Sequence, residues 1–177
     1  KAMTDIAWDG YLFSQPDSAF ILAQLQYDLA KEKGLKKHMG LALNIQAVSF
    51  HIRGNYLQAI EHYSRSMTIF EELEDESNIA NLLNNIGNIY KSQGDYQKAM
   101  ENYTRSLKVL EKLGDKKGMA YALNNLGVIY FDQGDKAKAM DYYTRSLKIR
   151  EEIGDKKGIA MSLNSIGVIY DYQGDND

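Results

Sequence analysis

Asparagines recur at a fixed interval along the chain, and their carboxamides are the side chains with the clearest binding chemistry. One row repeats every 40 residues, a shorter row follows directly after it, and one further asparagine stands nearby: Asn44, Asn84, Asn124 and Asn164; Asn85 and Asn125; and Asn88. An amide offers two donors and an acceptor, which suits it to the backbone N–H and C=O groups of a peptide. The same amides would also pair between neighbouring repeats, because buried polar groups must be hydrogen-bonded. Both interpretations are open for the first row, whereas ligand contact is favoured for Asn85, Asn88 and Asn125.

Larger side chains accompany these amides. Lys91, Tyr121 and Phe131 fall on the same segments, where an aromatic ring could anchor a bound peptide, although Phe131 could equally pack between repeats. A row of arginines recurs in "YSRS" and "YTRS": Arg65, Arg105 and Arg145. We interpret this row as solvated or paired with acidic residues on the next turn, with partner binding as the alternative.

Residues that would make the chain an enzyme or a metalloprotein are few. The histidines His38, His51 and His62 lack the spacing of a metal site, and the sequence contains no cysteine. It also lacks a serine in a G-x-S-x-G turn and a glycine-rich phosphate loop. We therefore expect no catalytic residues, no metal and no cofactor.

The charge balance argues against a polyanionic partner. Twenty-one Lys and Arg residues stand against 24 Asp and Glu residues, for a net charge of -3, so a nucleic-acid-binding footprint is not expected. No apolar run is long enough to span a bilayer, and "KAMTDIAWDG" lacks the features of a secretory signal. The sequence does not determine the cellular compartment of the protein, and the cytoplasm is favoured. Because the sequence begins with Lys, we interpret it as a piece of a longer protein.

Internal repetition places the amides on equivalent elements. Residues 79–118 and 119–158 are identical at 25 of 40 positions without a gap. The same frame extends backward over a drifted repeat, 39–78, and a degenerate first repeat, 1–38, and forward over half a repeat, 159–177. Such an array predicts a single domain, 1–177, in which each unit packs on its neighbours.

Within one unit the spacing predicts a helix, a turn and a second helix. Apolar or small residues recur at steps of three and four, which predicts helix A over 78–92 and helix B over 95–113. Between them, Gly94 can adopt a positive φ and Asp95 can cap helix B. The chain has one proline, Pro16, and no alternating apolar stretch, so the predicted fold is all-α.

The repeats resemble those of tetratricopeptide repeat proteins. The residues that carry the resemblance stand at the spacing of that family's signature: Leu83, Ile86, Gly87, Tyr90, Ala99, Tyr103 and Ser106. The resemblance implies a right-handed superhelical solenoid of antiparallel helix pairs, with small residues at each crossing of helices A and B. It also implies a concave surface lined mainly by helix A, whose asparagines often contact a bound peptide.

Two departures from the family pattern stand out. The unit has 40 residues instead of about 34, and Glu111 replaces the closing proline, so a longer helix B is expected. The positions at which some family members clamp a C-terminal carboxylate with lysines and arginines hold other residues here: Leu41, Asn44, Asn81, Asn84 and Tyr121. A clamp of that kind is therefore not expected.

Two functions of different classes are consistent with the sequence. The first is a protein-interaction scaffold that binds a peptide or helix of a partner in the concave groove, using the asparagine rows, Tyr121 and Lys91. The second is a regulatory or self-associating arm of a larger signalling enzyme. Forty-residue units with this sequence pattern are similar to those of LGN-type scaffolds and of bacterial repeat regions linked to sensor kinases or nucleotide cyclases. Leu163, Gly167 and Tyr170 are expected to be uncovered, which predicts self-association through the C-terminal face.

Overall fold

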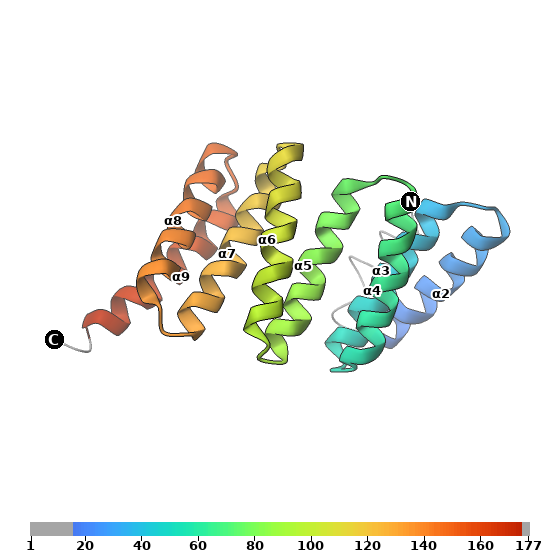
Figure 1. The fold of residues 1–177 in the computed structure, drawn as a ribbon, viewed down its shortest axis with the longest axis horizontal. Helices are drawn as coiled ribbons and strands as arrows, with labels where there is room; N and C mark the ends of the chain where they lie inside the picture. The colour runs from blue at the N-terminus through green and yellow to red at the C-terminus, as the bar shows by residue number, and fades with distance from the viewer. Residues whose placement is uncertain (1–15, 175–177) are drawn as a thin grey trace. The chain divides into compact units, whose positions relative to one another are not determined.

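The described part of the protein, residues 16–174 of a computed structural model, contains helices as its regular elements (Figure 1). In chain order they are α2 (Pro16–Glu32), α3 (Lys36–Ile52), α4 (Tyr56–Glu72), α5 (Glu76–Ser92), α6 (Tyr96–Leu113), α7 (Lys116–Asp132), α8 (Lys136–Glu152) and α9 (Lys156–Gly174). The chain forms two compact units, Lys1–Ile89 and Tyr90–Asp177, which are described separately. The boundary falls near the end of α5.

The turn between α5 and α6 uses the local chemistry that the sequence predicts. Gly94 has a φ of 76°, and the Asp95 carboxylate accepts a hydrogen bond from the backbone N–H of Lys98, so it caps α6. The predicted bounds of helix A and helix B therefore differ from α5 and α6 by at most two residues, within the usual uncertainty of helix ends. The described connections between consecutive helices have two or three residues, within the usual length of helix–helix connections.

One turn has a residue other than glycine at its positive-φ position. Glu74 has a φ of 52° and occupies the position that Gly34, Gly114 and Gly154 hold in the other repeats, where φ is also positive. A non-glycine residue in this left-handed region is strained, because its Cβ approaches the backbone carbonyl.

The first unit has its core between α2, α3, α4 and the first part of α5. The buried cluster includes Ala23, Ile45, Tyr63 and Leu82, one from each helix. Ser66 Oγ on α4 donates to Gly40 O on α3 at 2.8 Å, so this buried hydroxyl is paired. Apolar burial and one satisfied hydroxyl thus hold these helices together.

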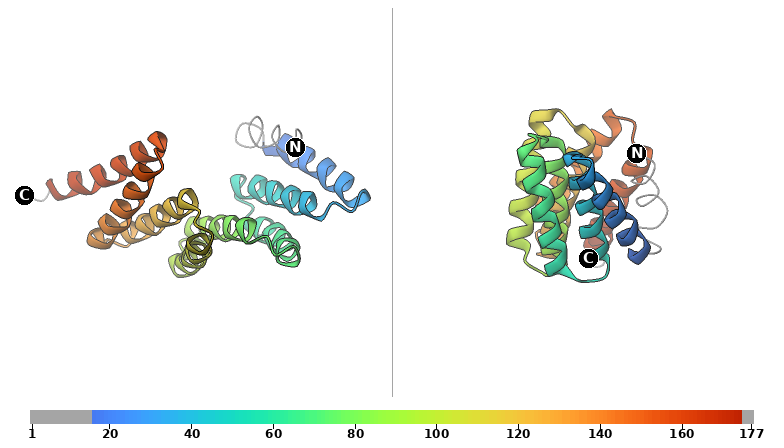
Figure 2. Two further views of the ribbon diagram at one scale, coloured as in Figure 1. Left: turned by 90° about the horizontal axis from the view of Figure 1, so that it is seen from above. Right: turned by 90° about the vertical axis from the view of Figure 1, so that its right-hand side faces the viewer.

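The second unit repeats this arrangement with α7, α8 and α9. The contacts α6–α7, α7–α8 and α8–α9 can be followed in Figures 1 and 2. A Cβ added to Gly127 of α7 would lie 2.6 Å from a ring atom of Tyr143 on α8, so α7 and α8 cross at that glycine. Ser146 Oγ on α8 donates to Ala120 O on α7 at 2.8 Å, as Ser66 does in the first unit. The expected small residue at the crossing is confirmed for this pair.

Some expectations need correction or lie outside the described range. The helices α7 and α8 both have 17 residues, so the extra length of the unit is not confined to helix B as expected. In the degenerate repeat 1–38, α2 is the second helix, while residues 1–15 lie outside the described residues. The division of the chain into repeats at 38, 78, 118 and 158 stays a prediction.

Candidate peptide-binding faces

The α5 helix carries four asparagines on one face in the first unit. Their spacing of i, i+3, i+4 and i+7 places them side by side along two turns of helix: Asn81, Asn84, Asn85 and Asn88. Asn81 is exposed, and the other three side chains are half-buried. This face presents donors and acceptors over about 10 Å of helix length. Asn81 was not among the predicted site residues, although its spacing from Asn84 is visible in the sequence.

One amide of this face is already paired with the neighbouring helix A. The Asn85 Nδ2 atom donates to Asn44 Oδ1 on α3 at 3.2 Å. This is the cross-repeat contact that the structural interpretation of the asparagines expects, and it ties α3 to α5 between adjacent positions of the two asparagine rows. A contact of Asn44 or Asn85 with a ligand stays a prediction.

The second unit has a related face on α7. Tyr121, Asn124 and Asn125 have the spacing of one helix face; Tyr121 is 44% exposed and both asparagines are half-buried. The Asn124 Oδ1 atom is buried and accepts no hydrogen bond from any described residue. An unmet buried acceptor costs about 1–3 kcal/mol, so a donor from a ligand or from solvent would be stabilising there.

The remaining predicted site residues of the second unit, Lys91 and Asn164, lie on other helices. Lys91 is half-buried in the last turn of α5, and Asn164 is exposed on α9; within residues 90–172 neither makes a hydrogen bond or an ion pair. Phe131 packs edge-on against Tyr172, with ring centroids 5.6 Å apart, and contacts the buried cluster of α8 and α9. For Phe131 the packing interpretation is therefore confirmed.

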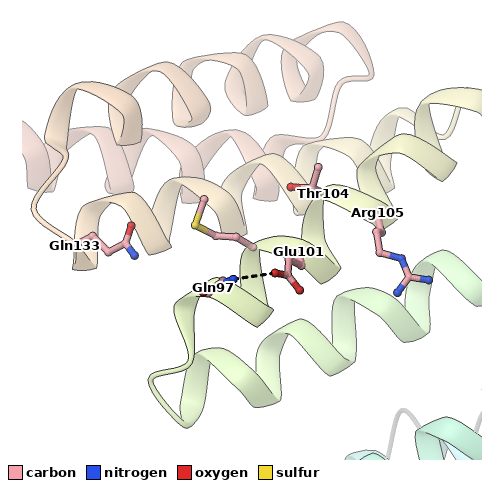
Figure 3. A pocket seen from close by; sticks show the side chains of 6 residues that line it. Gln97, Glu101, Thr104, Arg105 and Gln133 are labelled. Atoms are coloured by element: carbon pink, nitrogen blue, oxygen red, sulfur yellow. Dashed lines mark hydrogen bonds between the residues drawn. The ribbon is translucent and has the colours of Figure 1, made fainter.

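Two arginines of the helix B row have partners within their own unit. Arg65 lies over the Tyr27 ring at 5.8 Å, and Arg145 pairs with Asp141 at 3.4 Å and lies over Tyr142. Arg105 borders an open depression of about 630 Å³ on the α6 side of the second unit (Figure 3). Its other lining residues are Gln97, Met100, Glu101, Thr104 and Gln133.

The buried residue Arg150 was missed by sequence reasoning. It is 1% exposed in the last turn of α8, at the position held by Phe70 and Leu110 in the two preceding repeats. The signal for it was present in the sequence, because the change from leucine to arginine is visible when the repeats are superposed.

Neither a metal-binding cluster nor a membrane-spanning helix occurs in residues 16–174. No group of three or more histidine and acidic side chains there is arranged to hold a metal ion. Within the same range, the helices are too short or too polar to cross a membrane.

The sequence matches a known family of helical repeat proteins. A model of the tetratricopeptide repeat matches residues 38–112 and 118–177. The chain therefore belongs to the tetratricopeptide repeat family, whose repeats form all-α solenoids of helix pairs and serve in general as non-catalytic protein-interaction scaffolds. No curated protein sequence matches the chain.

Solved structures of similar fold have low sequence identity to this chain. A Rap protein complexed with Competence and Sporulation Factor is 20% identical with a TM-score of 0.84, and the match covers 98% of this chain and 52% of that one. Aspartyl phosphate phosphatase F from Bacillus subtilis is 18% identical with a TM-score of 0.83, covering 98% and 49%. A signal transduction ATPase with a tetratricopeptide repeat sensor, from Pyrococcus horikoshii, is 15% identical with a TM-score of 0.79, covering 95% and 26%. The chain thus spans about half or less of these three proteins.

Proposed function

We propose that this chain binds an extended peptide or a helix of a partner protein through the asparagine-bearing faces of its A helices, without catalysing a reaction on it. The observation that carries the proposal is the four-asparagine face of α5. Solvated helix faces usually carry charged residues, and buried ones carry apolar residues. A face made of amides, three of them half-buried, has the hydrogen-bonding capacity to pair with a second backbone.

The chemistry of the amide explains what such a face would recognise. Each carboxamide can donate to a peptide C=O and accept from a peptide N–H, so several in a line follow a backbone without selecting its side chains. On the α7 face the half-exposed Tyr121 ring would add apolar contact, and Asn124 Oδ1 would gain the donor that it lacks among the described residues. The Rap protein, of similar fold, was solved in complex with a factor, which supports a binding role for such helix arrays.

A peptide array probed with the purified chain tests the proposal. For a captured peptide, the Asn81→Ala, Asn88→Ala double variant is expected to weaken binding at least tenfold, because each lost charge-free hydrogen bond is worth about 1 kcal/mol. Asn102→Ala is the matched control, since its amide lies on helix B and donates to its own helix at Lys98 O, 2.8 Å away.

The affinity of the double variant decides whether the α5 face is the binding site. If it equalled that of the wild type, the proposal would be refuted. Loss of binding in Arg105→Glu would then place the site at the depression on α6, a helix B. Circular dichroism at 222 nm must show both variants folded before affinities are compared.

A second candidate, the self-associating regulatory arm, is favoured by the exposed face of α9. Leu163 is 52% exposed, whereas its equivalent Leu123 on α7 is 2% exposed beneath α8. A Cβ added to Gly167 would meet nothing within 4 Å, while the equivalent Gly127 is in contact with Tyr143. The apolar strip that a helix B covers in the preceding repeat is therefore open here, and a second copy of the chain would bury it.

Size-exclusion chromatography with light scattering tests this candidate. The wild type is expected to form dimers as concentration rises, and the Leu163→Glu, Tyr170→Glu variant to stay monomeric. A wild type that remains monomeric at the highest concentration, like the variant, would remove self-association from consideration.

A further inference from the structure

A buried arginine without a carboxylate partner lies near the candidate face on α7. Arg150 is 1% exposed and forms no ion pair with any residue in the described range. The nearest acidic influence is that of Asp155, whose carboxylate instead caps α9 by accepting from Gly158 N at 3.0 Å. Burial lowers the pKa of Arg150, but a guanidinium remains protonated in proteins. A buried charge of this kind is strongly destabilising unless something pairs with it.

The adjoining helix is adapted to hold the guanidinium in one orientation. Arg150 Nη1 donates to Gly158 O at 2.5 Å and to Ser162 Oγ at 3.1 Å, both on α9. A Cβ at Gly158 would lie 2.8 Å from Arg150 Cδ, so glycine leaves the room that the side chain occupies. Ser162 stands where the equivalent helices have Leu82 and Ala122. The arginine is therefore anchored through a single nitrogen.

The two remaining nitrogens form a free edge. Nε and Nη2 are buried and donate to no described residue. These two atoms lie on the same edge of the planar guanidinium, and their parallel N–H bonds match the two oxygens of a carboxylate. The Tyr121 ring centroid is 5.4 Å from Arg150 Cζ, so this half-exposed ring covers the guanidinium from the α7 side.

We propose that the Nε–Nη2 edge of Arg150 binds a carboxylate of the peptide partner, which gains access when the Tyr121 side chain turns aside. The inference rests on the proposed function, because the carboxylate is taken to belong to a bound peptide. A monoanion fits better than a phosphate, since one guanidinium with Asp155 nearby cannot balance two negative charges. The site differs from a clamp of helix A lysines, because its cation comes from helix B and is buried before the ligand arrives.

Small carboxylates test the site without a peptide partner. N-acetylglycine carries only a C-terminal carboxylate, and N-acetylglutamic acid α-amide carries only a side-chain carboxylate, so the two probes separate the possible sources. We expect the Nε–Hε signal of Arg150 in a ¹⁵N–¹H spectrum to shift saturably with at least one probe. The neutral N-acetylglutamine amide, and sodium chloride at equal ionic strength, should leave it in place.

Variants identify the signal and guard against misfolding. Arg150→Leu should remove the response and still fold, because Leu110 already packs against Gly118 at the equivalent position, 2.6 Å from a Cβ built there. Arg105→Leu, which removes an exposed arginine from α6, should leave the response unchanged. Tyr121→Ala keeps the arginine and removes its cover, so it should bind the probe at least threefold more tightly.

The possible outcomes separate this inference from the proposed function. An Arg150 signal that shifts no more with either probe than with chloride overturns the inference and marks a structural arginine only, even if peptides bind elsewhere. A Tyr121→Ala variant that binds more weakly would also overturn it. Probe binding together with an array that captures no peptide would support the carboxylate site and overturn the peptide-binding function.

Discussion

The crossing of α7 and α8 offers a sharp test of the packing, because the same repeat position occurs twice with opposite surroundings. Gly127 and Gly167 are equivalent residues of helix A. A Cβ at Gly127 would lie 2.6 and 2.7 Å from two ring atoms of the buried Tyr143, whereas a Cβ at Gly167 would meet nothing within 4 Å. Gly→Ala should therefore change stability in opposite directions at the two sites.

The expected changes in unfolding free energy combine an overpacking cost with a gain in helix propensity. Overpacking against a buried ring costs about 1–3 kcal/mol, and the higher helix propensity of alanine offsets about 1 kcal/mol of that. Gly127→Ala should thus lose about 1 kcal/mol net and lower the melting temperature by about 2–4 °C, while Gly167→Ala should gain up to about 1 kcal/mol. In α3 this position holds Ala47, in the same cluster as Tyr63, so a methyl is tolerated when the whole interface is built around it.

Urea denaturation followed by circular dichroism at 222 nm measures both variants against the wild type. The quantity that matters is the difference between the two sites, because the gain in helix propensity is common to both and the difference isolates the overpacking at Gly127. If Gly127→Ala were as stable as the wild type or more so, as expected for Gly167→Ala, the close approach of α7 and α8 would be wrong.

Three further substitutions test local features. Glu74→Gly should raise the unfolding free energy by about 1 kcal/mol, because it relieves a left-handed residue; a loss in urea denaturation would contradict that conformation. Ser146→Ala should cost about 1 kcal/mol through the lost bond to Ala120 O, whereas the exposed Thr144→Ala should change stability by less than about 0.5 kcal/mol in the same assay. The pKa of Asp135 is lowered by hydrogen bonds from the Lys138 side chain and backbone N–H, so its stabilisation is present above the unfolded-state pKa of about 3.9 and is lost as pH falls through the lower folded-state pKa. Asp135→Asn should therefore destabilise at pH 6 and much less at pH 2, and an equal effect at both pH values would exclude this ionic contribution.

Much of the local structure could be predicted because it depends on neighbours in sequence. The turn at Gly94 and the cap at Asp95 follow from φ preference and side-chain reach over three residues. The helix A and helix B bounds follow from an apolar period of 3.6, and the family follows from seven residues at its signature spacing. The face that Asn81, Asn84 and Asn88 share was also available, since helical spacing alone places them together.

Contacts between repeats depended on the tertiary structure. The chemistry of an asparagine does not say whether it faces a ligand or the next helix, and only packing brought Asn85 within 3.2 Å of Asn44. Likewise, the sequence shows that an arginine replaces a leucine at position 150. It does not predict that this arginine is buried, because a long charged side chain can usually reach solvent. Its burial was decided by a glycine and a serine on the following helix, which leave space and accept its hydrogen bonds only once α8 and α9 are packed together.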